Sequence, residues 1–288
     1  MAQSAAAQEQ GPGAQHVFGL TVASPFALPG AARVETGTPD LVIVRGPAQL
    51  SGSAEQRGPY RRQDTRLELD IPDAGRFLLG APGRLEVAER SDVDPEVLGA
   101  FLIASGLPML LWQRGGLLLH ASGVALGDRV IALSGPSGVG KSTIARAMLD
   151  HGGQLLGDDT LWLPDPEQPA WAQGITGGQF LRDAATGEPR FNSLPPARQA
   201  GPGNLSALVI LSHEPKDPVR LGPVAAAQAV LRARHRPLVP ELLDRNAAVL
   251  AHCIRLAAAL PVFRLGIEPG KPEAAAAMVH RLAEGSAA

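Results

Sequence analysis

The residues with the clearest chemical meaning are 135–142, which read Gly-Pro-Ser-Gly-Val-Gly-Lys-Ser and fit the phosphate-loop pattern G-x-x-x-x-G-K-S. Glycines let the backbone curl, so that several N–H groups point at one chain of phosphates. A helix that begins near Lys141 would add its positive dipole end. Lys141 would bring a mobile charge to the β- and γ-phosphates, and the Ser142 hydroxyl would bind Mg²⁺. We therefore predict a nucleotide site formed by Gly135, Pro136, Ser137, Gly138, Val139, Gly140, Lys141, Ser142 and Thr143.

Two adjacent carboxylates, Asp158 and Asp159, follow seventeen and eighteen residues after Lys141. A helix of about ten residues and a short turn fill that interval, so residues 154–163 should contain the neighbouring strand. Its carboxyl end would emerge beside the phosphate loop, where open α/β sheets bind ligands. Because adjacent side chains at a strand end point in different directions, one carboxylate can face the metal and the other the incoming nucleophile. The alternative is a solvated turn that carries two acids.

A third candidate is His120, which lies in the apolar run 117–126. This run and the strand 129–134 are joined by Gly127-Asp128, a dipeptide typical of a two-residue hairpin turn. Since the second strand leads into the phosphate loop, His120 is predicted near the nucleotide end. The alternative is a buried histidine with a structural role only.

The elements that must position these residues suggest two domains. Residues 1–15 are predicted to be a disordered tail, and residues 16–92 a small β-rich domain with five short strands. Asp94 can cap a helix whose first turn holds Pro95, which places the domain boundary near 91–95. In residues 93–288, buried strands at 205–213 and 261–267 and helices at 240–260 and 272–284 accompany the hairpin and the loop. Strands that alternate with helices indicate an α/β layer architecture.

Composition excludes several classes of function. The 288 residues contain 26 Lys and Arg against 28 Asp and Glu, so no basic excess points to nucleic acid. The single cysteine, Cys253, lies in an apolar helical pattern typical of a core thiol. The N-terminal residues lack the pattern of a signal peptide, and the uncharged stretch Val97–Gln113 is interrupted by Gly106 and Pro108, so two buried helical pieces are expected there. We expect a cytoplasmic protein that does not bind membranes.

Together these residues resemble the catalytic domain of the HPr kinase/phosphorylase family. That family combines a His-containing strand, a hairpin, a G-x-S-G-x-G-K-S loop and an apolar strand that ends in Asp-Asp. The resemblance covers residues 115–165 well and the rest weakly. It implies an α/β P-loop kinase domain, with a mixed sheet flanked by helices, that uses ATP and Mg²⁺. The residues in matching order and spacing are His120, Gly138, Lys141, Ser142, Asp158 and Asp159.

The resemblance also implies roles. Asp159 would serve as the base toward a substrate serine, with Asp158, His120 and Lys141 as the other catalytic residues and Ser142 and Asp158 as metal ligands. The loop departs from the family in Pro136 and Thr143. The family's later segment with a metal-binding Glu is not visible, so the resemblance does not extend to phosphorylase activity. Asp183 and Glu188 are two guesses for that ligand.

The front domain resembles the HPr kinase-related proteins of peptide natural-product clusters, including lasso-peptide kinases. This implies a serine kinase whose partner is a peptide precursor or a small HPr-like carrier protein, and it leaves a homo-oligomer open. The alternative is a nucleotide-binding switch or ATPase that uses the front domain to bind a partner. A loop of this sequence also occurs in ABC ATPases. Residues 176–180 (Thr-Gly-Gly-Gln-Phe) faintly resemble the signature loop of those proteins, but they follow Lys141 too closely for a helical subdomain to lie between.

Overall fold

The computed structural model describes residues 13–35, 37–182, 189–214 and 217–285. The first strand begins at Ala14, so the predicted tail of residues 1–15 is two residues too long. Gln15 explains the difference: its buried side chain donates to the Phe26 carbonyl and accepts from the Leu28 amide, both at 2.8 Å. These two bonds hold the start of the strand against the loop that follows it.

The N-terminal part is a single sheet. Within the described residues it has nine strands in the order β3-β1-β2-β4-β9-β8-β7-β6-β5, where the sequence predicted five. One reason is that the apolar run 17–24 is not a single strand: the chain turns back at Phe18 and Gly19, which have φ angles of 51° and 69°. Strand β5 is exposed throughout, so it has no apolar pattern to detect. The strands are β1 (Ala14–Val17), β2 (Leu20–Ala23), β3 (Ala32–Val34), β4 (Leu41–Arg45), β5 (Glu55–Arg57), β6 (Tyr60–Gln63), β7 (Arg66–Ile71), β8 (Gly75–Leu79) and β9 (Arg84–Glu89).

A long helical segment follows the sheet. Helix α1 (Pro95–Phe101) is capped by the Asp94 carboxylate, as predicted, and continues through a π-helical turn (Leu102–Gly106) into α2 (Leu107–Arg114). The predicted break into two pieces is therefore wrong. Pro108 lies in the first turn of α2, directly after the wide π turn, where its missing N–H interrupts no α-helical bond pattern. The segment Pro95–Arg114 is long and apolar enough to span a bilayer, but about two thirds of it is buried inside the protein, as in a core helix.

The C-terminal part is built on a mixed sheet in the order β13-β11-β12-β18-β20-β19. Strands β11 (Ala121–Leu126) and β12 (Arg129–Ser134) form the predicted hairpin, while β12, β18 (Gly203–Ser212) and β20 (Val262–Gly266) run parallel. The fold is mixed α/β, as the sequence predicted. The remaining strands are β10 (Leu117–Leu119), β13 (Gln154–Gly157), β14 (Leu161–Leu163), β15 (Trp171–Ala172), β16 (Gly178–Arg182), β17 (Pro189–Ser193) and β19 (Val219–Arg220).

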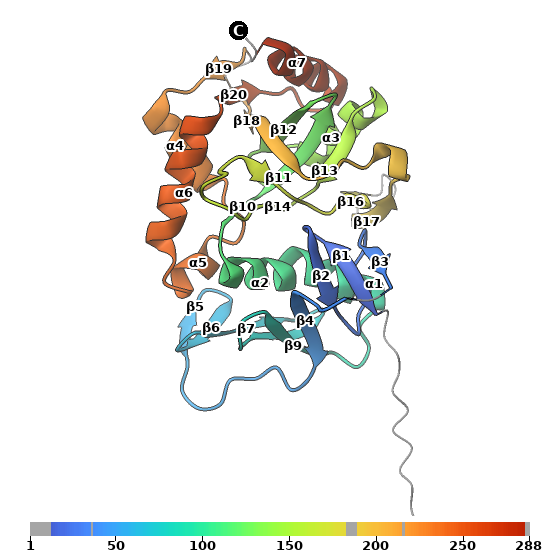
Figure 1. The fold of residues 1–288 in the computed structure, drawn as a ribbon, viewed down its shortest axis with the longest axis vertical. Coiled ribbons are helices and arrows are strands. Elements are labelled where there is room, and N and C mark those ends of the chain that lie inside the picture. The colour runs from blue at the N-terminus through green and yellow to red at the C-terminus, as the bar shows by residue number, and fades with distance from the viewer. Residues whose placement is uncertain (1–12, 36, 183–188, 215–216, 286–288) are drawn as a thin grey trace, which may run out of the picture.

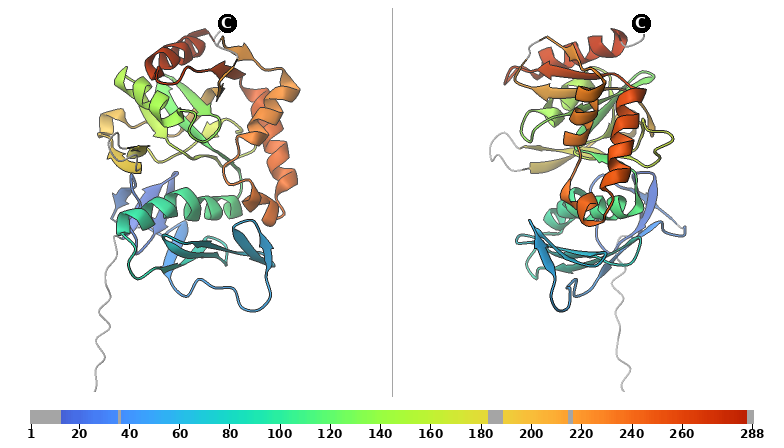
Figure 2. Two further views of the ribbon diagram at one scale, coloured as in Figure 1. Left: turned by 180° about the vertical axis from the view of Figure 1, so that it is seen from behind. Right: turned by 90° about the vertical axis from the view of Figure 1, so that its left-hand side faces the viewer.

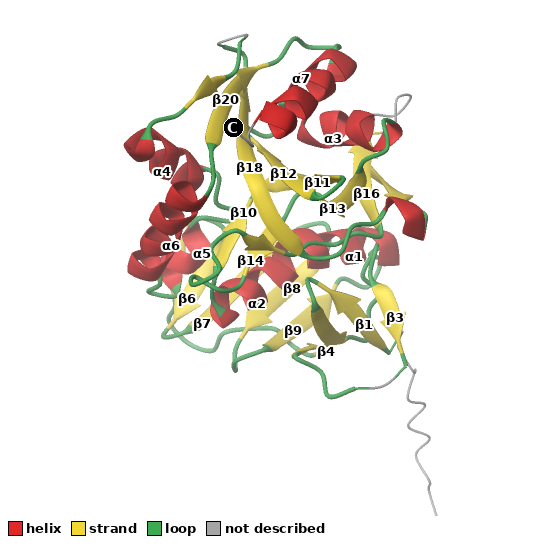
Figure 3. Ribbon diagram, turned by 45° about the horizontal axis from the view of Figure 1, so that its top comes forward, coloured by secondary structure: helices red, strands yellow, loops and turns green. Residues whose placement is uncertain are grey.

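Helices cover both faces of this sheet. Helices α3 (Lys141–Asp150) and α7 (Pro272–Gly285) lie on one face, and α4 (Pro223–Arg232) and α6 (Asn246–Ala259) lie on the other (Figure 3). Alternate residues of β12 divide between the two layers: Ile131 and Leu133 pack with α3 and α7, and Val130 and Ala132 pack on the opposite face. The helix predicted over 240–260 is two helices, α5 (Leu238–Leu242) and α6, separated at Asp244, whose φ is 56°.

The position of β13 corrects one prediction. This strand pairs with β11 and not with β12, so it is one strand further from the glycine loop 135–140 than expected. The place next to β12 is taken by β18. Because β11 is antiparallel to both of its neighbours, β13 and β12 still run in the same direction, and their carboxyl ends reach the same edge.

One apolar core connects the two parts. It contains Phe77 and Leu85 from the N-terminal sheet, Trp112 from α2, and Leu118 and Leu208 from the C-terminal half. Figures 1 and 2 show α2 lying between the nine-stranded sheet and the rest of the chain. The domain boundary predicted near 91–95 stays a prediction, and it falls just before a helix that both parts bury.

Trp112 provides a test of this shared core. Its side chain is fully buried, and its indole N–H donates to the His235 carbonyl at 2.9 Å. Trp112→Ala should lower the free energy of unfolding by about 3–5 kcal/mol, because it leaves a large cavity and an unpaired carbonyl. Urea denaturation measures the loss. Val97→Ala, on the exposed side of α1, is the control and should change stability by less than about 1 kcal/mol. Equal values for the two variants would contradict the shared core.

Candidate active site

The loop 135–140 joins the central strand β12 to helix α3. Gly135, Gly138 and Gly140 have φ angles of 148°, 79° and 104°, a region that side chains with a Cβ disfavour. At Gly135 a Cβ would also lie 2.7 Å from the Leu211 carbonyl oxygen of β18. The loop glycines are thus required by local conformation, and at Gly135 by close packing as well.

Lys141 begins helix α3 and folds back over the loop. Its Nζ donates to the carbonyl oxygens of Gly135 at 3.1 Å and Pro136 at 3.2 Å. Burial lowers the pKa of the Lys141 ammonium, and the charges of Asp159 and Asp158 partly offset that effect. The ammonium group is therefore held at the mouth of the loop by carbonyls, with two carboxylates nearby.

Asp158 faces the helix that follows the loop. Its Oδ1 accepts a hydrogen bond from the Ser142 hydroxyl at 3.0 Å and a short one from the Ser122 hydroxyl of β11. Burial raises the pKa of Asp158, the neighbouring charge of Asp159 raises it further, and the two hydroxyl bonds lower it. Ser142 and Asp158, predicted as metal ligands, are thus in direct contact.

Asp159 faces the other way. Its backbone has a φ of 65°, a left-handed conformation that is strained for a residue with a side chain. This turn brings Oδ1 to 3.3 Å from His120 Nε2 and Oδ2 to 3.6 Å from His235 Nε2. Burial raises the pKa of Asp159, but the hydrogen bond to His120 and the charges of His235, His120 and Lys141 outweigh it and lower the value to about 2. The carboxylate is ionised and 44% exposed, so it is accessible from solvent.

His120 lies between strands β10 and β11. Its carbonyl accepts from the Ser134 hydroxyl at 2.8 Å, which ties it to the last residue of β12 before the loop. Its amide donates to the Ala233 carbonyl at 2.7 Å. The residue therefore lies beside the end of β12 that leads into the loop 135–140, and its role at a nucleotide stays a prediction. Strand β10 itself pairs with β14 and does not extend the hairpin.

His235 is a site residue that the sequence analysis missed. It follows α4, and its amide donates to the Leu118 carbonyl at 2.9 Å, which sets its ring beside that of His120 with centroids 5.6 Å apart. Its Nδ1 lies 2.7 Å from the Thr160 hydroxyl. Burial lowers the pKa of His235 to about 4, so the ring is neutral at pH 7. The surrounding Arg-His-Arg triplet is typical of an exposed turn, and no sequence signal connects it to Asp159.

Gln179 adds a contact from the hairpin β16–β17. Its buried side-chain amide donates to the Ser142 carbonyl at 3.1 Å, so the hairpin supports the start of α3. In the sequence, Gln179 has no signal of its own beyond its place in the segment 176–180. Asp183 and Glu188, the guessed additional metal ligands, lie outside the described residues.

The described residues contain no group of three or more His, Cys, Asp or Glu side chains arranged to hold a metal ion. A cation at this site would therefore depend on Ser142, Asp158, water and the phosphates of a ligand. Mg²⁺ is commonly bound in that way, with one or two carboxylates and substrate phosphates. The hard oxygen donors present fit it.

Fold and site together define a mixed α/β protein in which a glycine loop joins a central strand to a helix, with an Asp-Asp pair at the same edge. No family model and no curated protein matches this chain. Among solved structures, the chain is similar to the Hpr(Ser) kinase/phosphatase from Coxiella burnetii, at 16% identity and a TM-score of 0.37. The similarity covers 59% of this chain and 93% of that one. A reaction for this chain therefore has to be inferred from the residues of the site.

Proposed function

We propose that the protein is a kinase that binds Mg·ATP on the loop Gly135–Thr143 and transfers the γ-phosphoryl group to a serine hydroxyl of a peptide or small protein. One observation carries the proposal. The neighbouring carboxylates at the end of β13 have different partners: Asp158 contacts the Ser142 hydroxyl, while Asp159 lies between two histidines and is open to solvent. A nucleotide switch needs the first carboxylate, and a phosphoryl transferase needs both.

The loop and its lysine account for binding of the phosphates. Positive-φ glycines direct backbone N–H groups into one concavity, and the N-terminus of α3 adds its dipole. Lys141 would exchange its bonds to the Gly135 and Pro136 carbonyls for bonds to phosphate oxygens. That exchange is favourable because the buried ammonium gains an anionic partner.

Ser142 and Asp158 would hold Mg²⁺. When bound, the metal supplies positive charge to the β- and γ-phosphates. Ser142 would turn its hydroxyl oxygen from Asp158 to the cation, and Asp158 would act directly or through water. Burial raises the pKa of Asp158, and a bound cation would lower that pKa again and favour the carboxylate.

Asp159 would orient the nucleophile. In the transfer, the serine oxygen forms a bond to the γ-phosphorus, the bond to the bridging oxygen breaks, and ADP leaves. The serine proton passes to Asp159 and from there to solvent. A carboxyl group with a pKa of about 2 is a weak base, so its main contribution is to accept the hydroxyl hydrogen bond and align the oxygen. A loose transition state requires little proton removal before the phosphoryl group moves.

Asp158→Asn tests the metal role. The variant should need a several-fold higher Mg²⁺ concentration for half-maximal ATP binding, because the amide keeps the shape and loses the charge. Titration calorimetry of ATP at a series of Mg²⁺ concentrations measures it. Asp92→Asn, an exposed aspartate of the N-terminal part, is the control. An unchanged Mg²⁺ requirement would exclude Asp158 as a ligand.

The reaction itself can be tested without a known substrate. The protein is incubated with Mg·ATP labelled at the γ-phosphorus and an array of serine peptides, each paired with its alanine counterpart. Label on a serine peptide and not on its partner supports the kinase. Release of labelled inorganic phosphate, with no label on any peptide, would instead favour the nucleotide switch or ATPase.

A further inference from the structure

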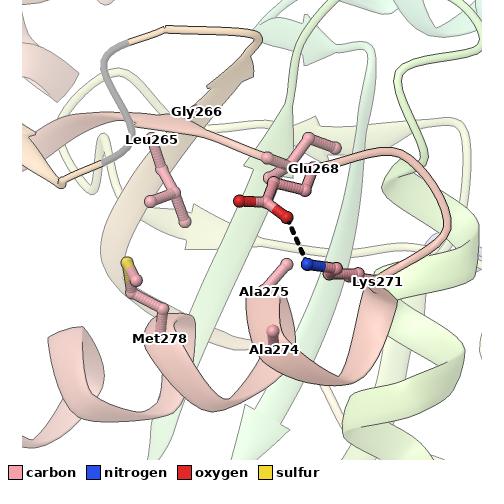
Figure 4. Close-up of a pocket in the computed structure, with 8 residues that line it drawn as sticks. Leu265, Gly266, Glu268, Lys271, Ala274, Ala275 and Met278 are labelled. Atoms are coloured by element: carbon pink, nitrogen blue, oxygen red, sulfur yellow. Dashed lines mark ion pairs between the residues drawn. The ribbon is translucent and has the colours of Figure 1, made fainter.

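A pocket of about 200 Å³ lies between the end of β20 and the first turns of α7 (Figure 4). Its apolar wall includes Leu265 from the strand and Ala275 and Met278 from the helix. Glu268 and Lys271, from the connecting loop, form an ion pair at 2.6 Å. The pocket thus combines an apolar interior with a carboxylate and an ammonium group, and none of these residues belongs to the site described above.

The pocket lies beside the loop 135–140. Ile267, which also lines it, has its Cδ1 atom 3.6 Å from the position that a side chain on Gly140 would occupy. Its amide donates to the Ser212 carbonyl at 2.9 Å, which fixes the end of β20 to the end of β18. Strands β12, β18 and β20 run parallel, so the end of β20 and the pocket beside it lie at the edge of the sheet from which the loop emerges. A ligand with phosphates on the loop could extend past Ile267 into the pocket.

The size and chemistry of the pocket restrict what it can take. Sites for a whole drug-sized ligand usually measure roughly 300–1,000 Å³. The pocket is smaller, so one flat ring system fits it better than an entire nucleotide. The thioether of Met278 suits contact with an aromatic ring. The Glu268 carboxylate can accept from ring or exocyclic N–H groups, and Lys271 can donate to ring nitrogen or carbonyl acceptors.

We infer that this pocket binds the purine base of the nucleotide whose phosphates lie on the loop Gly135–Thr143. The inference rests on the proposed function, because it needs a nucleoside triphosphate at the loop. It adds a specificity-determining subsite formed by residues about 130 positions further along the chain.

Two tryptophan substitutions on α7 test the subsite. Ala274 is exposed and lines the pocket, so Ala274→Trp would fill the space without disturbing the core. Ala277 is exposed on the same helix but does not line it, so Ala277→Trp is the matched control. Titration calorimetry compares Mg·ATP with Mg·tripolyphosphate, which has the phosphates and no base.

Ala274→Trp should weaken ATP binding at least ~10-fold and leave tripolyphosphate binding within about 2-fold, a selective loss typical of a blocked apolar subsite. Ala277→Trp should change neither affinity. Met278→Ala should also weaken ATP selectively, because it removes the thioether. Unchanged ATP affinity in both pocket variants, or equal losses for the two ligands, would overturn the base pocket.

The wild-type protein separates this inference from the proposed function. If it binds ATP and tripolyphosphate equally well, the phosphate site stands and the base pocket is wrong. If it binds neither ligand, the proposed function fails and the base pocket fails with it. Preference for pyrimidine over purine triphosphates would also contradict the inference.

Discussion

Asp159→Asn should lower phosphoryl transfer to the serine substrate by ~10²–10⁴-fold, the usual contribution of a positioned acid–base group. The amide has nearly the same shape as the carboxylate. It loses the negative charge that lies 3.3 Å from His120 Nε2 and 3.6 Å from His235 Nε2, and it presents a donor where the serine hydroxyl needs an acceptor. ATP affinity should stay within a few-fold of wild type, because Ser142 and Asp158 remain.

The measurement is a single-turnover assay of the labelled peptide, paired with calorimetry of ATP binding. Asp92→Asn serves as the control and should transfer at the wild-type rate. If Asp159→Asn loses ATP affinity and transfers normally once saturated, Asp159 belongs to the metal site and the nucleotide switch becomes the better interpretation. Full activity in all respects would remove Asp159 from the mechanism.

Lys141→Ala is expected to reduce transfer at least ~100-fold, a loss typical of removing one charge-stabilising group from a transition state. The folded protein should tolerate the change well. The ammonium group is buried with a lowered pKa, and its hydrogen-bond partners are two loop carbonyls. Its removal relieves the unfavourable burial of a charge, and this gain offsets the loss of the donor to those carbonyls. We therefore expect a large kinetic effect with only a small change in the melting temperature.

Arg255→Ala is the matched control for loss of a positive charge. Arg255 forms an exposed ion pair with Glu167, and such pairs contribute about 0–1 kcal/mol. Its removal should change neither transfer nor ATP binding. Transfer by Lys141→Ala at the rate of the control would rule out the phosphate-loop assignment, whereas a collapse of its melting temperature would mean that the lysine is needed for folding.

The local parts of the fold could be predicted because their signals lie close together in the chain. Gly127-Asp128 between two apolar runs requires a hairpin, and its register places Ala121 opposite Ser134. Asp94 before Pro95 predicts a cap, and the cap is there. The predictions failed where an element lacks its own pattern, as in the exposed strand β5, or where a neighbour changes its path, as at the π turn before Pro108.

The order of strands in the sheet could not be predicted from the sequence for a different reason. Residues 154–157 have the composition of a buried strand whichever neighbour they join. Their pairing with β11 follows from packing, since β18 competes for the edge of β12 and forms a longer parallel pairing there. Asp158 nevertheless contacts Ser142, as expected. The edge of the sheet at which a strand ends depends on the direction of that strand and not on which strand is its neighbour.

By itself the sequence determined the glycine loop 135–140, the hairpin before it and the Asp-Asp pair after it, because conformation and spacing over a few tens of residues fix these features. Only the tertiary structure brought His235 to Asp159, from 76 positions further along the chain, and Ile267 to Gly140. Closing the long loops between these residues costs conformational entropy. The burial of apolar surface across the whole core offsets that cost. No short sequence pattern indicates which distant residue will contact Asp159 or Gly140. The position of His235 and the pocket beside the loop can therefore be seen only in the folded protein.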